Sequence, residues 1–255
     1  SLVFGGPPCQ GFSVAGKMNP DDPRSRHVMN FASIVGKVRP YAFVMENVKA
    51  LGELEKWRNL RESLLGKFAE FGYVADFAVL NASDFGVPQS RERVFFVGFD
   101  ADVFGTDPEF DVASEMVRKR VPSPVTRDVL LSLDEPGEGN NAHVCTAKVS
   151  FASKPVMRKS PYAGMLFNGL GRPRKLDGYS ATLPATMGGN KTPIVDEEAL
   201  RKNSANWVEE YHARLMSGES PMSGEAPSRL RRLTVREAAA LQTFPSGYDF
   251  VGSRS

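Results

Sequence analysis

The stretch RPYAFVMENV, residues 39–48, contains the signal that ends a helix, then a strand pattern and then a carboxylate. Arg39 and Pro40 end the helical pattern that precedes them, because the residue before a proline avoids the helical conformation. The apolar run AFVM, residues 42–45, is typical of a buried strand. Glu46 follows this run directly. We therefore expect a buried strand that presents Glu46 at its carboxyl end.

On both sides of this stretch the sequence alternates between strand and helix patterns. Residues 2–4 form a short apolar strand, and apolar side chains recur at helical spacing over residues 28–38 and 57–71. Strand patterns follow at 73–80 and 93–99. About a dozen residues without a helical pattern separate these last two strands, so the second should return antiparallel. The alternation predicts an α/β fold with a mostly parallel sheet.

The amino-acid composition changes between Asp107 and Pro227. Prolines, glycines and polar residues dominate there, and strand patterns are short. We expect residues 1–106 to form part of one domain and residues 107–227 to form a smaller, irregular and mostly β domain. Residues 228–255 are expected to return to the first domain.

Two helices are expected beyond residue 200. Ser204 is the candidate N-cap of an amphipathic run. Thr234 and Glu237 form a capping box, in which each residue satisfies a free backbone amide at the start of a helix. That second helix is expected to run as far as Phe244, where a proline follows.

Composition limits the class of protein. Hydrophobic residues make up 41% and no apolar stretch is long enough to cross a bilayer. The formal net charge is only +2, but residues 141–192 carry eight basic residues and one acidic residue. This excess suits a polyanion or an ordinary solvated surface, and charge alone leaves both open. The two distant cysteines, Cys9 and Cys145, favour a reducing intracellular setting, and no Cys/His spacing indicates a metal site.

Three stretches place chemically active side chains at one edge of the expected sheet. Cys9 follows the first strand on a stiff Gly/Pro turn, and Glu46 ends the second strand. Arg91 and Arg93 begin the antiparallel return strand, so they start at the same edge. Ligands of open α/β sheets gather beyond the carboxyl ends of the parallel strands.

Each of these residues also has an ordinary explanation. A lone cysteine is most often a small buried apolar residue, and a carboxylate at a strand end often lies on the surface. Arg91 and Arg93 would then pair with Asp84 or Glu92. The joint placement nevertheless favours a site with a thiol nucleophile, an acid and anion-binding cations.

Four blocks of the sequence together resemble the bacterial DNA (cytosine-5)-methyltransferases. They are GGPPCQGFS (5–13), MENV (45–48), QSRERVFFVGF (89–99) and RRLTVREAAALQTFP (231–245), and their order and spacing match as well. The resemblance implies part of a Rossmann-like methyltransferase sheet and a target-recognition domain in the irregular region. Within that region SATLPATMGGN (180–190) resembles the most recurrent piece of the family.

By this resemblance, Cys9 is the nucleophile that adds to C6 of a cytosine, and Glu46 binds or protonates ring N3. Arg93 would fix the O2 oxygen and steady Cys9 and Glu46, while Arg91 would hold the nucleotide backbone. A nearby guanidinium favours the thiolate form that the attack needs.

The resemblance implies S-adenosyl-L-methionine as the cofactor, with Pro8 and His27 at its pocket. The glycine-rich loop and acidic strand ends that bind this cofactor in the family, and the family's last block, are not found in the sequence. We therefore expect the chain to carry the base chemistry with an incomplete cofactor pocket. It would be a fragment of a longer enzyme or one subunit that a complementary methyltransferase half completes.

The family acts on double-stranded DNA, and a cytosine must be flipped out of the duplex before its ring atoms can be reached. Candidate DNA contacts lie on the loop after the cysteine and in the recognition region, namely Gln10, Ser13, Arg24, Thr182, Gly188 and Gly189. Paired glycines permit a close backbone approach to DNA but also form simple tight turns, and the sequence leaves both open.

The resemblance further implies a bacterial enzyme of the cytoplasm, associated with the nucleoid, of restriction-modification or orphan type, and monomeric at full length. Two alternatives stay open. One is a DNA-binding protein of this fold without catalysis, and the other is an RNA cytosine methyltransferase.

Overall fold

The structure is a computed structural model in which the described residues are 1–8, 26–106, 109–202, 204–248 and 250. Within these ranges the chain forms two compact units. Unit 1 takes residues 1–85 and 91–121, and unit 2 takes residues 86–90 and 122–255. None of the helices in the described ranges is long and apolar enough to span a membrane.

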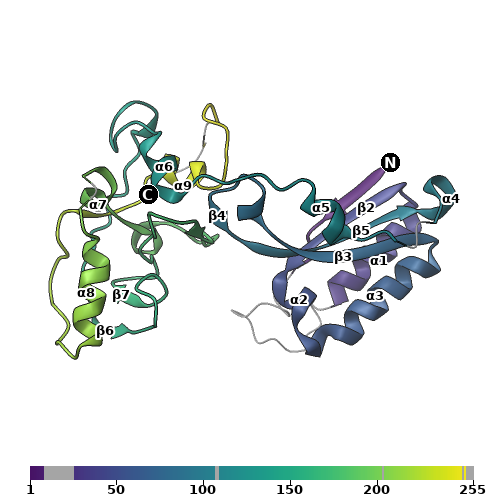
Figure 1. The fold of residues 1–255 in the computed structure, drawn as a ribbon, viewed down its shortest axis with the longest axis horizontal. Coiled ribbons are helices and arrows are strands. Elements are labelled where there is room, and N and C mark those ends of the chain that lie inside the picture. Colours follow the sequence, from purple (N-terminus) through teal and green to yellow (C-terminus); the bar gives the residue numbers. More distant parts are fainter. Residues whose placement is uncertain (9–25, 107–108, 203, 249, 251–255) are drawn as a thin grey trace. The chain divides into compact units, whose positions relative to one another are not determined.

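Unit 1 alternates strands and helices along the chain, as the sequence predicts. Its elements are β1 (Leu2–Gly5), α1 (Arg26–Val38), β2 (Ala42–Val48), α2 (Lys49–Glu53), a 3-10 turn (Glu55–Trp57), α3 (Arg58–Glu70), β3 (Tyr73–Asn81), a 3-10 turn (Ala82–Asp84), β5 (Glu92–Asp100), α4 (Ala101–Phe104) and α5 (Val112–Val117). The strands form a sheet in the order β1-β2-β5-β3, and α1 and α3 lie along one face of it (Figure 1).

The strand directions confirm the predicted topology. β1 pairs with β2 in parallel, with Phe4 opposite Val44. β5 lies between β2 and β3 and is antiparallel to both. The beginning of β5 therefore lies at the edge where β1, β2 and β3 end, which is the convergence that the sequence predicts.

The core of unit 1 lies between the sheet and the two long helices. Alternate residues of β2, Phe43 and Met45, are fully buried on this face. The Phe43 ring centroid lies 4.1 Å from that of Phe68 in α3 and 5.5 Å from that of Tyr73 in β3. Tilted and edge-to-face aromatic contacts among β2, β3 and α3 thus hold the sheet on this helix.

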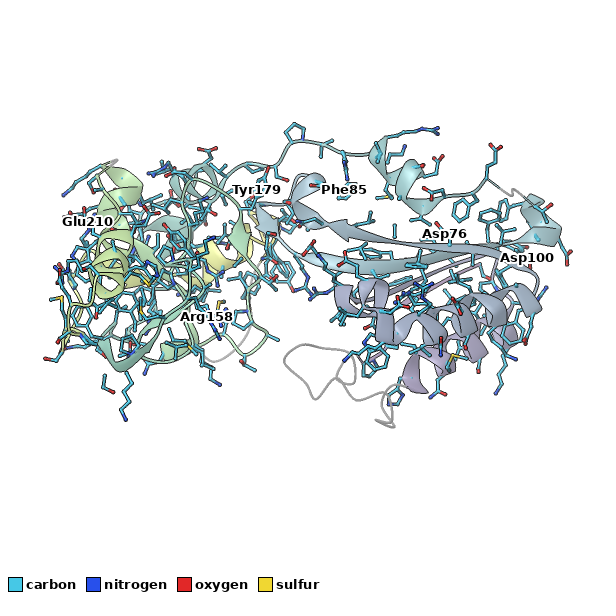
Figure 2. The ribbon with its side chains drawn as sticks, turned by 60° about the horizontal axis from the view of Figure 1, so that its bottom comes forward. Asp76, Phe85, Asp100, Arg158, Tyr179 and Glu210 are labelled. Atoms are coloured by element: carbon cyan, nitrogen blue, oxygen red, sulfur yellow. The ribbon has the colours of Figure 1, made fainter. Side chains whose placement is uncertain are left out.

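The other face of the sheet carries α5. The carboxylate of Asp76, labelled in Figure 2, accepts a hydrogen bond from the backbone nitrogen of Val112 at 2.9 Å. This bond satisfies a free amide at the start of α5 and ties the helix to the middle of β3.

Two glycine-to-alanine changes in unit 1 are expected to alter its free energy of unfolding in opposite directions. A Cβ on Gly98 of β5 would lie 2.4 Å from Cε1 of the Phe43 ring. We expect Gly98→Ala to lower stability by about 1–3 kcal/mol, the usual cost of overpacking a core.

Gly66 in α3 has nothing within 4 Å of its missing Cβ. Gly66→Ala should raise stability by about 0.5–1 kcal/mol, because alanine loses less backbone entropy in a helix. Urea denaturation measures both changes, and a shift of the same sign in both variants would contradict this packing.

Unit 2 is built from short strands and helices. Its elements are β4 (Gln89–Ser90), α6 (Thr126–Leu131), a 3-10 turn (Gly139–Asn141), β6 (Phe151–Val156), β7 (Met165–Phe167), β8 (Ser180–Ala181), a 3-10 turn (Gly189–Lys191), β9 (Ile194–Asp196), α7 (Glu197–Arg201), α8 (Trp207–Met216), β10 (Leu230–Arg232) and α9 (Val235–Ala240). Its described strands pair two by two, β4 with β8 in parallel, and β6 with β7 and β9 with β10 antiparallel.

Two apolar clusters form the core of unit 2. The first packs α6, α7 and α9 around Leu176 and Leu233. The second packs α8 against β6 and β7, where the Tyr211 ring centroid lies 5.1 Å from those of Phe151 and Trp207. These clusters give a region with little regular structure a defined interior.

The N-cap expected at Ser204 is wrong. Asn206 caps α8, and its side-chain oxygen accepts a hydrogen bond from the backbone nitrogen of Val208 at 3.0 Å. Ser204 lies two residues too early for this contact. Its hydroxyl instead accepts a hydrogen bond from Nη2 of Arg229 at 2.9 Å.

The capping box of α9 is confirmed. The Thr234 hydroxyl accepts from the backbone nitrogen of Glu237 at 3.0 Å, and the Glu237 carboxylate accepts from that of Thr234 at 2.8 Å. The helix ends at Ala240, however, and not at Phe244 as expected. Thr243 adopts a left-handed φ of 59°, which turns the chain out of the helix.

The compact units divide the chain differently from the expected domains. The second boundary of unit 1 falls after Val121, and Leu230 and Leu233 are buried in the clusters of unit 2. The units are defined by packing, whereas the expected division at residues 107 and 228 concerns function. That division therefore stays a prediction.

Candidate active site

An ion pair between Glu46 and Arg93 forms the centre of the candidate site. Arg93 Nε lies 2.9 Å from Glu46 Oε1, and the two side chains are 22% and 37% exposed, in that order. Glu46 is opposite Phe95 and Arg93 is opposite Val48 in the β2–β5 register. The two residues are thus diagonal neighbours on one face of the sheet. This face is the one turned away from Phe43 and Met45, which pack on α1 and α3.

The turn after β1 is built against this pair. A Cβ on Gly6 would lie 3.1 Å from Glu46 Oε2, so glycine lets the turn approach the carboxylate closely. Asn47, which is 1% exposed, donates a hydrogen bond from Nδ2 to the carbonyl oxygen of Pro7 at 3.1 Å. Gly6 and Asn47 are not among the residues that the sequence predicts for the site, although they lie inside its GGPP and MENV blocks.

The turn leads directly to the predicted nucleophile. Pro8 is the last described residue before it, and Cys9 lies outside the described residues. The predicted DNA contacts Gln10, Ser13 and Arg24 lie outside them as well. The turn up to Pro8 and the Glu46–Arg93 pair form the described part of the candidate site.

The two other acids considered as partners of Arg93, Glu92 and Asp84, each pair with a different basic residue. Glu92 pairs with Lys49, whose Nζ lies 2.8 Å from Glu92 Oε1. Asp84 pairs with Arg120 at 3.2 Å. Arg93 pairs with Glu46, so the ordinary explanation that it serves Asp84 or Glu92 is wrong for this residue.

Arg91 lies just before β5 and is held through its backbone. Its nitrogen donates to Oδ1 of Asn81 at 2.9 Å, and its carbonyl oxygen accepts from the nitrogen of Ala82 at 3.0 Å. One bond to the last residue of β3 and one to the 3-10 turn that follows it thus fix the backbone of this arginine.

Pro8 and His27, the two candidate contacts for S-adenosyl-L-methionine, are both exposed. Proline offers no side-chain hydrogen bond, and an exposed imidazole offers one donor or acceptor on each ring nitrogen. The cofactor carries a carboxylate, an ammonium group and two ribose hydroxyls. These two residues alone do not fit that set of groups.

The recognition residues expected in unit 2 have defined backbone surroundings. Thr182 is exposed and donates its hydroxyl to the carbonyl oxygen of Ser90 at 3.1 Å. Gly189 begins a 3-10 turn with a left-handed φ of 49°. A tight turn is therefore sufficient to explain Gly189, while its contact with DNA, and that of Gly188, stays a prediction.

Most of the basic residues between 141 and 192 lie on the surface of unit 2. Those that are exposed and have no ion pair among the described residues are Lys154, Arg158 (labelled in Figure 2), Lys159, Arg172, Lys175 and Lys191. Lys148 pairs with Glu225 at 2.6 Å. Arg174 is only 5% exposed, and burial lowers the pKa of its guanidinium to about 10. The described residues contain no cluster of His, Cys, Asp and Glu that could hold a metal ion.

The sheet defines an α/β protein, and the ion pair lies at the carboxyl ends of its parallel strands, where such folds hold their ligands. The chain belongs to the C-5 cytosine-specific DNA methylase family, whose model matches residues 1–255. This match confirms the family that the four sequence blocks indicate.

Individual relatives agree with the family. The Type II methyltransferase M.MthTI of Methanothermobacter thermautotrophicus is 30% identical over 262 residues, which cover 97% of this chain and 68% of that protein. The Type II methyltransferase M.AquIA of Picosynechococcus is 50% identical over 105 residues, which cover 38% of this chain and 42% of that protein. The Type II methyltransferase M.DdeI of Desulfomicrobium norvegicum is 28% identical and matches 99% of this chain but only 64% of its own length. The chain thus spans less than two thirds of some of these relatives.

Solved structures share the fold. The S. pombe Dnmt2 methyltransferase superposes with a TM-score of 0.56 at 18% identity, over 99% of this chain and 68% of that one. The Entamoeba histolytica methyltransferase EhMeth gives the same TM-score of 0.56 at 14% identity, over 99% of this chain and 69% of that one. The expected methyltransferase fold class is confirmed.

We expect the Glu46–Arg93 pair to contribute little to folding. Partly exposed ion pairs are worth roughly 0–1 kcal/mol, because water screens them. A double-mutant cycle with Glu46→Gln, Arg93→Gln and the double variant, followed by urea denaturation, measures the coupling. A coupling energy of about 3 kcal/mol or more, as in buried pairs, would make this a structural pair and not a site.

Proposed function

We propose that this protein is a DNA (cytosine-5)-methyltransferase, which transfers a methyl group from S-adenosyl-L-methionine to C5 of a cytosine flipped out of duplex DNA. The observation that carries the proposal is the Glu46–Arg93 pair built against the Gly6–Pro7 turn, directly before Cys9. Membership of the C-5 cytosine-specific DNA methylase family supports it.

The chemical problem is that C5 of cytosine is a poor nucleophile. In the proposed mechanism the Cys9 thiolate adds to C6, and the ring becomes an enamine whose C5 is electron-rich. After C5 has gained the methyl group, loss of the C5 proton and of the Cys9 thiolate restores the aromatic ring. The cofactor supplies the methyl group as an electrophile.

Glu46 acts on the opposite side of the ring in this proposal. Its carboxyl group would share or donate a proton to N3, which draws electrons from C6 and assists the attack. Glu46 is 37% exposed, so a base can reach it without unfolding the sheet.

The arginines supply positive charge in fixed positions. Arg93 already holds Glu46 through Nε and donates from Nη1 to the carbonyl oxygen of Glu92 at 2.7 Å. With its orientation set in this way, it would hold the O2 oxygen of the base beside Glu46. Arg91 would hold the phosphate of the flipped nucleotide. The exposed basic residues of unit 2 suit the remaining duplex backbone.

The covalent step gives the most direct test. Duplex DNA that carries 5-fluorocytosine should trap the full-length protein in the presence of S-adenosyl-L-methionine, because fluorine cannot leave from C5 as the proton does. The expected result is a complex that survives denaturing electrophoresis. Cys9→Ser should abolish it, whereas the matched change Cys145→Ser should leave it at the wild-type rate.

Two other outcomes would replace the proposal. Retardation of duplex DNA without any trapped complex would favour a DNA-binding protein without catalysis. Trapping by fluorinated RNA in preference to DNA, in a direct competition, would favour an RNA methyltransferase.

Glu46→Gln is expected to act on the chemical step. We expect the single-turnover rate of methyl transfer to fall by about 100-fold or more, the usual loss for a general acid. Duplex DNA affinity and the urea midpoint should stay near those of the wild type. An unchanged rate would remove Glu46 from the mechanism.

A further inference from the structure

Cys145 is a thiol of unit 2 that the proposed mechanism does not use. It lies in the loop between the 3-10 turn Gly139–Asn141 and β6. The residue itself is half-buried, whereas its neighbours Val144 and Thr146 are exposed. A small molecule can therefore reach this thiol from solvent.

The thiol contacts the turn that contains Gly189, one of the predicted DNA contacts. Sγ of Cys145 lies 3.8 Å from the carbonyl oxygen of Gly189 and 3.7 Å from the hydroxyl oxygen of Thr192, and donates to either of them. A thiol has one proton and is a weak donor, so only one of these bonds forms at a time. Gly189 begins the 3-10 turn and Thr192 directly follows it, so the thiol touches both ends of the turn.

Thr192 also contacts a buried cation of unit 2. Arg232 in β10 is 2% exposed, and its Nη1 donates to the carbonyl oxygen of Thr192 at 2.8 Å. Its Nη2 donates to Oδ1 of Asn168 at 2.9 Å, and its longer bonds go to backbone carbonyl oxygens. All of these acceptors are neutral, and Arg232 forms no ion pair with any residue that the structure describes.

Arg232 also has a donor to spare. Its Nε is buried and makes no hydrogen bond within the described ranges of the chain. Burial lowers the pKa of this guanidinium, and a negative charge on Cys145 would raise it. A buried charge without a partner is costly. An oxygen added to Cys145 would supply an acceptor, and in its ionised form it would also supply the missing negative charge.

The contacts of Cys145 leave no room for a further atom between the sulfur and the turn. An oxygen bonded to Sγ and directed at Gly189 or Thr192 would lie closer to the oxygen of that residue than the roughly 2.7 Å of a normal O–H···O bond. The turn is closely packed as well, since a Cβ on Gly171 would lie only 1.9 Å from the carbonyl oxygen of Thr192. Addition of an oxygen would therefore break the bond between the thiol and the turn and displace the turn.

We propose that Cys145 is a modification site, at which hydrogen peroxide oxidises the thiol to a sulfenic acid, Arg232 receives the new oxygen, and the Gly189–Lys191 turn shifts. One S–O bond forms, the O–O bond of the peroxide breaks, and water leaves with the thiol proton. The sulfur loses two electrons and the peroxide gains them. Two molecules of a small thiol reverse the step, because the first forms a mixed disulfide with release of water and the second frees Cys145.

The consequence for DNA rests on the proposed function. Gly188 and Gly189 are predicted DNA contacts, and Lys191 is exposed and has no ion pair among the described residues. A displaced turn no longer presents these residues to a duplex in their original positions. Oxidation of Cys145 therefore lowers the affinity for duplex DNA.

The oxidation itself is tested without DNA. The full-length protein with Cys9→Ser, which removes the predicted nucleophile as a second target, is treated with hydrogen peroxide and then with dimedone, a reagent for sulfenic acids. Peptide mass spectrometry locates the label. We expect Cys145 to be labelled about tenfold faster in the folded protein than in urea, because only the folded protein holds Arg232 near the thiol. Slower labelling in the folded protein, as for a thiol that is merely half-buried, would overturn the proposal.

The part of Arg232 is tested by Arg232→Gln in the same Cys9→Ser background. Loss of the charge should bring the labelling rate down to that in urea, and the urea midpoint shows whether this variant is folded. Arg214→Gln is the matched control, because Arg214 pairs with Glu219 at 3.3 Å on the surface of unit 2. It should leave the rate unchanged. Equal rates in the two folded variants would remove Arg232 from the proposal, and if Arg232→Gln does not fold, the comparison of folded and unfolded Cys9→Ser protein decides.

The effect on DNA is measured as duplex affinity before and after peroxide, in Cys9→Ser and in Cys9→Ser/Cys145→Ser. We expect oxidation to weaken binding about tenfold in the first protein, with recovery in dithiothreitol, and to leave the second unchanged. Both proteins contain the same methionines, so an equal loss in both would assign the effect to methionine and overturn the link between Cys145 and the turn. Unchanged affinity with Cys145 oxidised would overturn it too. If the untreated protein binds no duplex DNA, the proposed function fails, while the labelling still decides whether Cys145 is a modification site.

Discussion

The antiparallel insertion of β5 between β2 and β3 is the constraint on which the candidate site depends. β1 and β2 bring a turn and a carboxylate to one edge of the sheet, and neither carries a cation there. β5 spans nine residues, so a parallel β5 would place Arg93 at the opposite edge, roughly 25 Å away. Because β5 runs the other way, its second residue lies beside Glu46.

The sheet also separates the core from the chemistry by simple alternation. Phe43 and Met45 point toward the helices, and Glu46 points away from them. The residues that pack β2 into the core and the carboxylate of Glu46 therefore lie on opposite faces of the strand. A site built in this way can stay open to a ligand at little cost to the hydrophobic core.

Many of the helices and strands could be predicted from the sequence because their signals are local. The helical spacing over 28–38 and the capping box of Thr234 and Glu237 depend on neighbours a few residues away. The end of α9 and the cap of α8 were mispredicted for the opposite reason. Ser204 and Asn206 are both good caps, and the bond from Arg229 to Ser204 that accompanies the choice comes from far along the chain.

The same distinction applies to the site. The convergence of Glu46 and Arg93 follows from two features of the sheet. The antiparallel direction of β5 is predicted from the sequence, whereas its place beside β2 is seen only in the structure. The contact of Gly6 with Glu46 and the bond from Asn47 to Pro7 depend on side-chain placement that no pattern reveals. The bond between Thr182 and Ser90 joins residues 92 positions apart, so no local pattern predicts it.

If unit 2 carries the target recognition that the proposed function gives it, its composition from two separate stretches matters for the exchange of recognition specificity between related enzymes. In a chimaera that receives only residues 122–255 from a related enzyme, β4 of the recipient would have to pair with β8 of the donor. A chimaera that receives residues 86–90 together with 122–255 keeps β4 and β8 from the same protein, and the recipient's own chain resumes at Arg91. The natural module for exchange is thus discontinuous, and one of its seams lies one residue before β5.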